Sequence, residues 1–508
     1  MTDRPEYVIV QAGGRGSRLR HHTWNKPKCL VSIHGKPILY HLFDRFPNAA
    51  FIIIGDYLFE QLEAYVALNP PSNPTTLVRA AGSGTCAGIA QAISLVPTGS
   101  SVTLVWSDLY LKTSPRWPLS DKPILCTTAA FACRWSLDGE GGLEERTSEQ
   151  RGIPGLFHFN ASETVPAIPI EGEFVRWWSE NIREFAPLSF DALEELGDFA
   201  TIEQLNDREG FSRFFNDVKI DEHTVTKTVI DPKFDALQKN EIAWYQAAHK
   251  LGFKRIPKVL AEQPLTLERI RGRHAFQFTD LTIRERRAVM MNYIDTLESL
   301  HRLDRVPAVA TDAHAVYVEK SRQRVESIAR IIPGIDAKSV TVNGRKCRNP
   351  FTDTPPNFWE EIAKTLAPRE FHPIHGDPTF SNSLIDQNLS VWFIDPRGYF
   401  KSPGIYGDAV YDFAKVYYSA VGNYDAFNRR KFKLYVDGTS VEVLMEDSPF
   451  ALGAKDIFRE YFNDDFRKIQ IIHGLIWLSL TGYVRDDIDS IIGSFYLGLY
   501  WLEEGLKG

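Results

Sequence analysis

The 508-residue chain contains little cysteine and no long hydrophobic run. An odd number of scattered cysteines without a CxxC pair disfavours both a disulfide framework and a structural zinc site, and it fits a reducing cytoplasm. The longest apolar stretch near the C-terminus, residues 474–484, is about half the length that crosses a bilayer. The N-terminus is acidic and polar where a signal peptide would be positive and then apolar. We therefore expect a cytoplasmic protein without a membrane span.

Neither sign of charge is in large excess. The 58 Lys and Arg residues against 65 Asp and Glu residues give a formal net charge of −7, which argues against bulk attraction to nucleic acid. The sequence contains no repeat and no low-complexity tract, so it belongs with folded globular proteins. At roughly 100 to 200 residues per domain, the length predicts two to four domains. Small molecules are the expected partners, and homo-oligomer formation is left open.

Short β-branched segments alternate with helical patterns over the first 110 residues. This alternation predicts a parallel sheet with helices on both faces, and further strands are expected to extend the sheet. The expected strands are 7–11, 50–55, 101–106, 127–134 and 155–160, and the expected helices are 37–46, 58–68 and 88–95.

The pattern changes beyond residue 205. Alternating apolar and polar residues there are typical of antiparallel hairpins, and a helix is expected at 236–251. After residue 281 helical patterns dominate, interrupted by one strand-rich island at 371–395. We therefore predict two domains, 1–205 and 206–508.

The segment from Gln11 to Leu19 follows the first expected strand and has the chemistry of a phosphate-binding turn. Its glycines let the backbone approach a triphosphate, and Arg15 and Arg18 add positive charge. Lys28, held next to Pro27, can reach an α-phosphate and neutralise charge during transfer. A tight turn alone would explain the glycines but not Arg18 and Lys28. The expected nucleotide contacts here are Gly13, Gly14, Gly16 and Ser17.

Two further motifs follow in order. Residues 82–88, GSGTCAG, precede a helix and can place a nucleobase and ribose against backbone, with Gly82, Gly84 and Thr85 as the expected contacts. Asp108 stands just beyond a strand, where a Mg²⁺ ligand would face the phosphates. Together with the glycine-rich turn and Lys28, these motifs resemble the sugar-phosphate and phosphocholine nucleotidylyltransferases over about residues 7–110.

This resemblance implies a Rossmann-like domain that releases pyrophosphate when a substrate phosphate attacks the α-phosphorus of an NTP. Lys28 would be the catalytic cation, Arg18 would lie on the pyrophosphate side and Asp108 would bind Mg²⁺. CTP or UTP is the expected NTP. The family usually supplies a second metal carboxylate late in the domain. The candidates are Glu194, Glu195 and Asp198, of which we retain Asp198, and a solvated residue is the alternative for each.

The strongest motif in the chain is HGDPTFSN at residues 375–382, followed by an Ile-Asp strand end at Asp395. Asp377 can orient and deprotonate a hydroxyl group, while Asn382 and Asp395 can bind the Mg²⁺ ions on ATP. The pattern resembles the aminoglycoside phosphotransferase and choline kinase family over roughly residues 206–430. It implies a two-lobed, protein-kinase-like α+β domain, with an N-lobe at about 206–272 and a C-lobe at about 273–508.

The upstream part of such a kinase needs a strand lysine and a helix glutamate. Lys227 lies in a β-branched segment and Glu241 lies in the next expected helix, so Lys227 can contact ATP phosphates while Glu241 orients it. Each alone is typical of a surface residue, and only their order ahead of the HGD motif points to ATP. Residues 266–272, which include Glu268, are expected to contact adenine.

The acceptor region is less specific. In the resembled family, aromatic residues and a carboxylate downstream of the metal strand help to form the acceptor site. The corresponding residues here are Tyr399, Tyr406, Asp408, Tyr411 and Asp412. An aromatic box would suit a quaternary ammonium group, but core packing of the tyrosines and helix-start positions of the two carboxylates are the competing interpretations.

Two phosphate chemistries on one chain predict a reaction sequence. The C-terminal domain would phosphorylate a hydroxyl compound with ATP, and the N-terminal domain would join that phosphate to a nucleotide, giving an activated precursor for cell-surface glycan or lipid assembly. A sugar or polyol is the expected acceptor, and choline or another amino alcohol is the alternative. An aminoglycoside resistance kinase would have no use for Lys28, and a non-catalytic nucleotide-binding regulator would not need Asp108, Asp377 and Asp395 together.

Overall fold

The computed structural model describes residues 4–161, 167–207, 216–230 and 234–507. The chain divides into two compact units. The N-terminal unit comprises Met1–Glu209 with Asp486–Asp489, and the C-terminal unit comprises Gly210–Arg485 with Ser490–Gly508. Each unit contains its own sheet and its own buried core.

A seven-stranded sheet in the order β12-β8-β11-β6-β1-β4-β5 forms the centre of the N-terminal unit. Strands β1, β4, β5 and β6 are all parallel, as the alternating pattern predicted, whereas β11 runs antiparallel to both of its neighbours. The strands are β1 (Tyr7–Gln11), β4 (Ala50–Gly55), β5 (Thr75–Arg79), β6 (Ser101–Trp106), β8 (Ile124–Thr127), β11 (Leu156–Asn160) and β12 (Ala186–Ser189). Shorter strands are β2 (Ser32–Ile33), β3 (Lys36–Pro37), β7 (Leu109–Leu111), β9 (Ser136–Leu137), β10 (Leu143–Glu144) and β13 (Leu193–Glu195).

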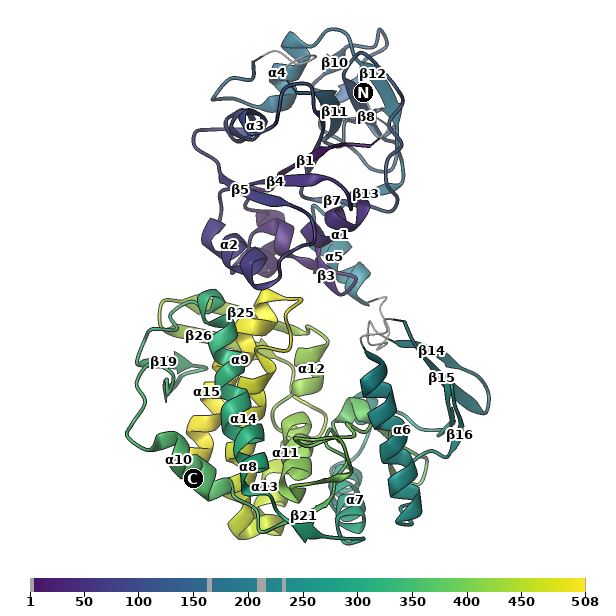
Figure 1. Cartoon of the computed structure of the whole chain (residues 1–508), viewed down its shortest axis with the longest axis vertical. Coiled ribbons are helices and arrows are strands. Elements are labelled where there is room, and N and C mark those ends of the chain that lie inside the picture. Colours follow the sequence, from purple (N-terminus) through teal and green to yellow (C-terminus); the bar gives the residue numbers. More distant parts are fainter. Residues whose placement is uncertain (1–3, 162–166, 208–215, 231–233, 508) are drawn as a thin grey trace. The chain divides into compact units, whose positions relative to one another are not determined.

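Helices cover both faces of this sheet (Figure 1). The central strand β1 is apolar on both sides, and Val8, Ile9 and Val10 are fully buried, as expected for a strand covered on both faces. One core packs α3 and α4 against the sheet, and a second core lies around α1 and α5. The helices are α1 (Ile38–Arg45), α2 (Phe59–Leu68), α3 (Thr85–Ser94), α4 (Phe174–Asn181) and α5 (Phe199–Asp207).

The C-terminal unit begins with a four-stranded antiparallel sheet, in the order β14-β15-β17-β16, and the helix α6 beside it (Figure 1). Trp244 and Tyr245 of α6 are buried. A four-stranded antiparallel sheet beside one helix is the arrangement expected of a kinase N-lobe. Its elements are β14 (Asn216–Ile220), β15 (Thr224–Val229), α6 (Asp235–Lys250), β16 (Val259–Glu262) and β17 (Leu265–Glu268).

Helices form most of the remaining C-terminal unit. α11 packs against α14, and α14 packs against α9, with Tyr417, Tyr418 and Trp477 fully buried. The helices are α7 (Ile283–His301), α8 (Ala310–His314), α9 (Lys320–Ile328), α10 (Phe358–Leu366), α11 (Ala409–Ala420), α12 (Tyr424–Asn428), α13 (Ala451–Phe462), α14 (Phe466–Leu480) and α15 (Ile488–Lys507). The strands of the predicted island are β21 (Glu370–Pro373), β22 (Ser383–Ile385) and β23 (Val391–Phe393), and β18 (Val306–Pro307) and β24 (Tyr406–Gly407) flank β21.

Two expectations about strands were wrong. The strand expected at 127–134 lies earlier, at Ile124–Thr127, because the apolar residues that the sheet buries are those before Thr128. The island at 371–395 is also not the only strand-rich part after residue 281. A second sheet is built from β19 (Ser339–Val342), β20 (Arg345–Arg348), β25 (Phe432–Asp437) and β26 (Ser440–Met445). Buried and exposed residues alternate along β25 and β26, a period that the surrounding helical patterns obscured.

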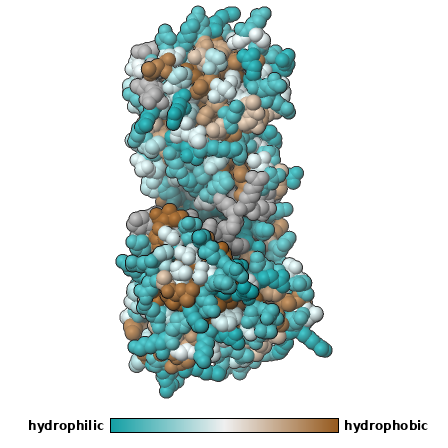
Figure 2. Space-filling model, turned by 90° about the vertical axis from the view of Figure 1, so that its right-hand side faces the viewer, coloured by the Kyte–Doolittle hydropathy of each residue, from teal (hydrophilic) through white to brown (hydrophobic). Residues whose placement is uncertain are grey.

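One face of the molecule is mostly hydrophilic (Figure 2). Hydrophilic side chains cover most of the face drawn in Figure 2, and hydrophobic ones occur there in separate patches. Within the described ranges, none of the helices combines the length and the apolar character needed to cross a membrane.

Candidate active sites

The glycine-rich turn and Asp108 lie at the same edge of the N-terminal sheet. Gln11 of β1 is the register partner of Trp106 of β6, and the Ser107 amide donates to the Gln11 carbonyl at 3.1 Å. The segments that follow these two parallel strands therefore leave the sheet side by side. Ligands of open α/β sheets bind at this carboxyl edge.

Lys28 and Asp108 form an ion pair at this edge. The Lys28 Nζ lies 2.7 Å from Asp108 Oδ2, and only 9% of the lysine side chain is exposed. Gly16 lies close to Lys28, because it has a φ of 63° and a Cβ there would lie 3.2 Å from the Lys28 Cβ. The structure thus brings together three of the residues predicted for nucleotidyl transfer.

The other residues of the turn differ in how closely they are packed. A Cβ on Gly13 would lie 3.3 Å from the Asp56 Cβ, whereas nothing lies within 4 Å of a Cβ on Gly14. Ser17 begins a 3₁₀ turn that ends at Thr23. Arg18 is mostly exposed, with 68% of its side chain accessible, and pairs with Glu195 at 3.3 Å. The Arg18 guanidinium is therefore accessible to an anionic ligand.

The stretch at residues 82–88 packs against a later loop. A Cβ on Gly82 would lie 2.8 Å from the Ile170 carbonyl oxygen, and one on Gly84 would lie 2.3 Å from that of Gly172. The Thr85 hydroxyl accepts a hydrogen bond from the Phe174 amide at 2.8 Å. These glycines thus allow a close approach of protein backbone, which is a structural reason for them that the sequence did not reveal.

The three candidates for a second metal carboxylate have different partners. Glu194 pairs with Lys112 at 2.7 Å, and Glu195 pairs with Arg18. Asp198 accepts hydrogen bonds from the Thr201 amide at 3.0 Å and hydroxyl at 2.7 Å, and these bonds are the main reason that its pKa is lowered. The Leu196 amide donates to the Asp108 carbonyl at 2.8 Å, so the segment that leads to Asp198 lies beside Asp108.

In the C-terminal unit, Lys227 of β15 joins the sheet to two carboxylates. Its Nζ lies 2.6 Å from Glu241 Oε1 of α6 and also pairs with Asp395. Burial alone would lower the pKa of Lys227, but the charges of Asp395 and Glu241 outweigh burial and raise it. The lysine is therefore a firmly held cation between the helix glutamate and the residue predicted to bind metal.

Asp377 lies between Asn382 and a lysine. Its Oδ2 accepts a hydrogen bond from the side-chain Nδ2 of Asn382 at 2.9 Å, and its Oδ1 lies 2.9 Å from the Nζ of Lys415 on α11. The Ile394 amide donates to the Asn382 carbonyl at 3.0 Å, which brings the segment of Asp395 next to that of Asn382. All three residues predicted from the HGD motif are thus brought together.

Buried groups hold the HGD loop in place. Asp412 of α11 accepts hydrogen bonds from the amides of His375 and Gly376, each at 2.8 Å, and it pairs with His301 at 3.1 Å. Burial lowers the pKa of His375, and its neutral ring accepts from the Asp377 amide at 3.3 Å. Asp412 therefore positions the loop, in addition to lying in the first turn of α11 as the sequence suggested.

The remaining predicted residues lie outside this cluster of contacts. Glu268 ends β17, and its amide donates to the Lys258 carbonyl at 2.9 Å. Asp408 caps α11 and accepts from the Tyr317 hydroxyl at 2.7 Å. Tyr406 donates to Asp304 at 2.5 Å. These bonds give Asp408 and Tyr406 structural roles.

The aromatic residues of the acceptor region do not form an open box. The Arg397 guanidinium lies 4.2 Å from the centroid of the Tyr399 ring, and the Lys415 Nζ lies 5.9 Å from that of Tyr411. Tyr411 is only 4% exposed. Protein cations therefore already lie against the ring faces that a quaternary ammonium group would need.

Sequence reasoning missed a group of cations beside Asp377. We call Lys320, Arg324, Arg397 and Lys415 the cationic cluster. Arg397 follows Asp395 by two residues, and Lys415 follows Asp412 on α11. Lys320 and Arg324 are four residues apart on α9, a spacing that places two side chains on one helix face.

The residues present fit Mg²⁺, which both resembled families use. Mg²⁺ prefers oxygen ligands and often takes one or two from the protein and the rest from substrate phosphates and water. Asn382 and Asp395 offer an amide and a carboxylate oxygen, and Asp108 offers a carboxylate. Over the part of the chain that the structure describes, no group of three or more His, Cys, Asp or Glu side chains forms a metal site.

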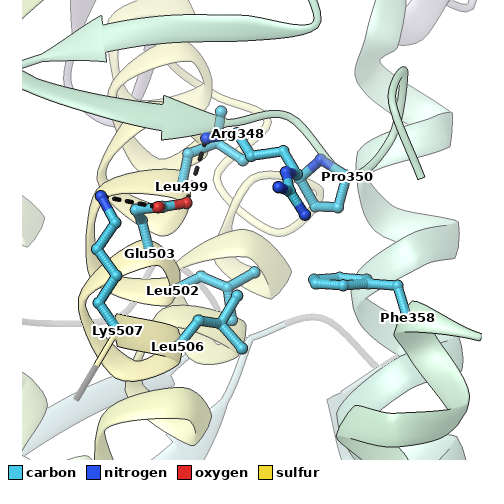
Figure 3. A pocket seen from close by; sticks show the side chains of 8 residues that line it. All are labelled: Arg348, Pro350, Phe358, Leu499, Leu502, Glu503, Leu506 and Lys507. Carbon is cyan, nitrogen blue, oxygen red and sulfur yellow. Dashed lines mark hydrogen bonds and ion pairs between the residues drawn. The ribbon is translucent and has the colours of Figure 1, made fainter. Parts of the chain in front are cut away.

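A separate cavity of about 180 Å³ lies between α15, α10 and the end of β20 (Figure 3). Leu502 and Leu506 face Phe358 across it, and Glu503 pairs with Lys507 at 2.9 Å on its rim. None of the residues that line this cavity is a predicted site residue.

Comparison with protein families gives two matches on this chain. Residues 8–115 match the MobA-like NTP transferase domain, and residues 218–441 match the phosphotransferase enzyme family known as APH. The first match contains Lys28 and Asp108, and the second contains Lys227, Asp377 and Asp395.

Individual relatives each cover a minority of this chain. The UTP–glucose-1-phosphate uridylyltransferase AglF of Haloferax volcanii is 53% identical over 38 residues, which are 8% of this chain and 16% of that protein. The crystal structure of HddC from Yersinia pseudotuberculosis in complex with GMP-PN is 16% identical, with a TM-score of 0.32 over 39% of this chain and 97% of that one. The CTP:phosphocholine cytidylyltransferase LicC from Streptococcus pneumoniae is 17% identical, with a TM-score of 0.33 over 39% of this chain and 97% of that one.

Proposed function

We propose that this chain, a nucleotidyltransferase domain fused to a small-molecule kinase domain, phosphorylates a sugar or polyol with ATP and then joins the new phosphate to a nucleotide. The product is an NDP-linked compound, and ADP and pyrophosphate are released. We place the domain boundary near residue 205, which gives a nucleotidyltransferase of residues 1–205 and a kinase of residues 206–508.

One observation supports this proposal above all. Asp377, Asn382 and Asp395 meet in one loop and strand pair, and Lys227 and Glu241 meet Asp395 from the sheet and α6. A carboxylate for the acceptor hydroxyl therefore lies near a lysine for the ATP phosphates, which is the arrangement that phosphoryl transfer requires.

In the kinase step, Asp377 accepts the proton of the acceptor hydroxyl. The hydroxyl oxygen forms a bond to the γ-phosphorus of ATP, and the bond from that phosphorus to ADP breaks. Lys227 binds ATP phosphates, and Glu241 keeps its ammonium group in position. Mg²⁺, when bound through Asn382 and Asp395, would neutralise phosphate charge.

In the nucleotidyltransferase step, a phosphate oxygen of the phosphorylated compound forms a bond to the α-phosphorus of the second NTP. The bond to pyrophosphate then breaks. Lys28 neutralises charge on the reacting phosphate, and the exposed Arg18 binds the pyrophosphate side. Asp108 would hold Mg²⁺, with Asp198 as its proposed second carboxylate.

We place the product in the assembly of cell-surface glycans, in the cytoplasm. The short match to a UTP–glucose-1-phosphate uridylyltransferase supports a sugar phosphate and makes UTP, with CTP, the first nucleotide to test. All five cysteines are free and buried, in keeping with a reducing compartment. Choline is a poor fit, because Arg397 and Lys415 lie against the tyrosine rings that would bind it.

A coupled assay tests the proposal. The purified chain is incubated with ATP, each of the four NTPs and a panel of sugars, polyols and amino alcohols, and mass spectrometry detects the NDP-linked product. Asp377→Ala should abolish ATP-dependent phosphorylation and leave pyrophosphate release from a pre-phosphorylated substrate intact. Lys28→Ala should have the opposite effect.

Surface variants provide matched controls. Lys122→Ala and Asp465→Ala change half-exposed side chains that pair with Glu184 and Lys468, and both half-reactions should be unchanged. Loss of both half-reactions in either Lys28→Ala or Asp377→Ala, with folding intact by circular dichroism, would contradict two independent sites.

A further inference from the structure

The cationic cluster gathers positive charge beside the proposed catalytic base. Lys320 and Arg324 come from α9, Arg397 follows β23, and Lys415 comes from α11. Tyr411 lines a cavity with Lys320, its hydroxyl accepts from Arg397 at 3.0 Å, and its ring centroid lies 5.9 Å from the Lys415 Nζ. The positive charges of Arg397, Arg324 and Lys415 also act on Lys320. Such a concentration of like charge in a half-buried place is unfavourable unless an anion compensates it.

The cluster lies on one side of the Asp377 carboxylate. Oδ1 of Asp377 faces Lys415 at 2.9 Å, whereas Oδ2 faces Asn382 at 2.9 Å. The two oxygens of one carboxylate point in different directions, so Asp377 separates the proposed metal ligand from the cluster. A hydroxyl group that donates to Asp377 therefore has cations available on the side away from Asn382.

Neutral partners hold the two arginines of the cluster. The Arg397 guanidinium donates to the Tyr411 hydroxyl at 3.0 Å, and the Arg324 guanidinium donates to the Ser479 carbonyl at 2.6 Å. These contacts fix the guanidinium groups without cancelling their charge. Arginines held in this way are well suited to carboxylate or phosphate groups.

Lys320 is the least compensated member of the cluster. Its ammonium group forms no hydrogen bond or ion pair with the residues that the structure describes, and with Tyr317 and Tyr411 it lines a small cavity next to α14. Burial and then the neighbouring cations lower the pKa of Lys320 well below its ordinary value. A bound anion would favour the charged form of this lysine.

The carboxylates in this region already have other partners. Asp408 accepts from the Tyr317 hydroxyl and caps α11, and Asp412 accepts from the amides of the HGD loop. Asp377 is thus the one carboxylate among the groups that act most strongly on Lys320. The cluster keeps an excess of positive charge that the described side chains do not neutralise.

We propose that the acceptor of the kinase site carries a carboxylate or phosphate group in addition to its reacting hydroxyl, and that the cationic cluster binds this group. The inference rests on the proposed kinase function and names the substrate class within it. ATP is the less suitable occupant, because Lys227, Asn382 and Asp395 already supply groups for its phosphates on the other side of Asp377. A cationic acceptor such as an aminoglycoside would be repelled.

Two series of acceptors test the proposal, each built on one carbon skeleton and differing in the charge of one group. The wild-type chain is assayed for ADP release with glucose, glucuronate, glucose 6-phosphate and glucosamine, and with glycerol, glycerate and glycerol 3-phosphate. We expect kcat/KM for at least one anionic member to exceed that of its neutral counterpart by tenfold or more, in line with about 1.5–3 kcal/mol for one charge-assisted hydrogen bond. A preference for the carboxylate acceptors or for the phosphate acceptors shows which of the two groups the cationic cluster binds.

Variants of α9 separate acceptor binding from ATP binding. Arg324→Gln should raise the KM for the anionic acceptor about tenfold or more and change the KM for ATP less than twofold, and Arg324→Lys should restore part of the loss. Arg322→Gln, on the same helix but about half exposed, should change neither value. Circular dichroism and thermal unfolding confirm that each variant is folded.

Three results would overturn the inference. A neutral or cationic acceptor with the same kcat/KM as the best anionic one would overturn the inference while leaving the proposed kinase function intact. A rise in the KM for ATP alone in Arg324→Gln would assign the cluster to the nucleotide. If no acceptor, whether neutral, anionic or cationic, led to ADP release, the proposed function and this inference would both be contradicted.

Discussion

Individual residues at both sites carry constraints that only the structure reveals. Gly16 has a left-handed backbone, and a Cβ there would lie 3.2 Å from the Lys28 Cβ, so a larger residue would be both strained and crowded against the proposed catalytic lysine. Asp425, deep in the C-terminal unit, accepts from the Ser381 amide at 2.9 Å inside the HGD motif. Gly16 contacts a proposed site residue, and Asp425 contacts the segment that holds two others.

Gly16→Ala should destabilise the N-terminal unit by about 1–2 kcal/mol, because an L-residue is strained in a left-handed conformation. The added methyl group should also displace Lys28 and slow pyrophosphate release. Urea unfolding and a pyrophosphate assay measure the two effects. Gly14→Ala is the matched control for stability, since a Cβ there meets nothing within 4 Å. Equal stability losses in both variants would show that the strain argument is wrong.

Asp425→Asn should change how stability depends on pH. Burial is the main cause that raises the pKa of Asp425 from 3.8 to about 6. The folded state therefore holds the proton more tightly, and this contribution to stability is present below pH 4 and lost as the pH rises through 6. The loss amounts to about 3 kcal/mol.

The asparagine stays neutral, so the free energy of unfolding of Asp425→Asn relative to wild type should rise between pH 4 and pH 7. Urea unfolding at both pH values measures this difference. Asp464→Asn, at an exposed position, should show no such change. A difference that is constant with pH would exclude a buried carboxylate that titrates near 6.

At the scale of elements, α11 supports the HGD loop. Asp412 lies in its first turn and accepts two loop amides, and Lys415, almost one turn later, reaches Asp377. The packing of α11 against α14 fixes the helix itself. The geometry of the kinase site therefore depends on a helix that supplies no proposed ligand for ATP or Mg²⁺.

Asp412→Ala should lower the free energy of unfolding of the C-terminal unit by about 3 kcal/mol or more, because two buried amides lose their acceptor. ATP-dependent phosphorylation should fall with it, while pyrophosphate release, in the other unit, should persist. Calorimetry and the two half-reaction assays measure these effects. Asp456→Ala removes an exposed carboxylate on α13 and serves as the control. Normal ATP-dependent phosphorylation by Asp412→Ala would show that Asp412 does not position the HGD loop.

The sequence alone predicted those elements that a short, contiguous stretch of residues specifies. The strand that ends at Gln11, the strand before Asp108 and the loop from His375 to Asn382 each combine a distinctive pattern with chemically reactive residues at adjacent positions. The sheet β20-β19-β26-β25 escaped prediction because its two strand pairs, β19 with β20 and β25 with β26, are far apart in the chain and their alternation is short. The cationic cluster escaped prediction for a similar reason, since its members come from segments that are far apart in the chain and the position of Lys320 and Arg324 depends on how α9 packs against α14.

The whole molecule combines two reaction centres in units with separate cores. If the phosphorylated intermediate is free to leave the kinase site, the two activities need not reside on the same chain. Fusion would then serve mainly to keep the two activities in equal amounts and the intermediate at a higher local concentration.

An equimolar mixture of Lys28→Ala and Asp377→Ala chains should therefore form the NDP-linked product, although each variant alone does not. The product should appear after a lag that shortens as the protein concentration rises, because the intermediate must pass between chains. A mass-spectrometric time course measures both. No product from the mixture, with each half-reaction intact in the appropriate variant, would show that the intermediate is not released.

The ion pair between Lys227 and Glu241 has a consequence for the control of flux. In many kinases the corresponding pair forms only after a helix swings inward, and that movement is the step on which regulators act. Here the pair is already closed at 2.6 Å and both side chains are almost fully buried. Flux through this chain should therefore require no inward movement of α6 to form the pair.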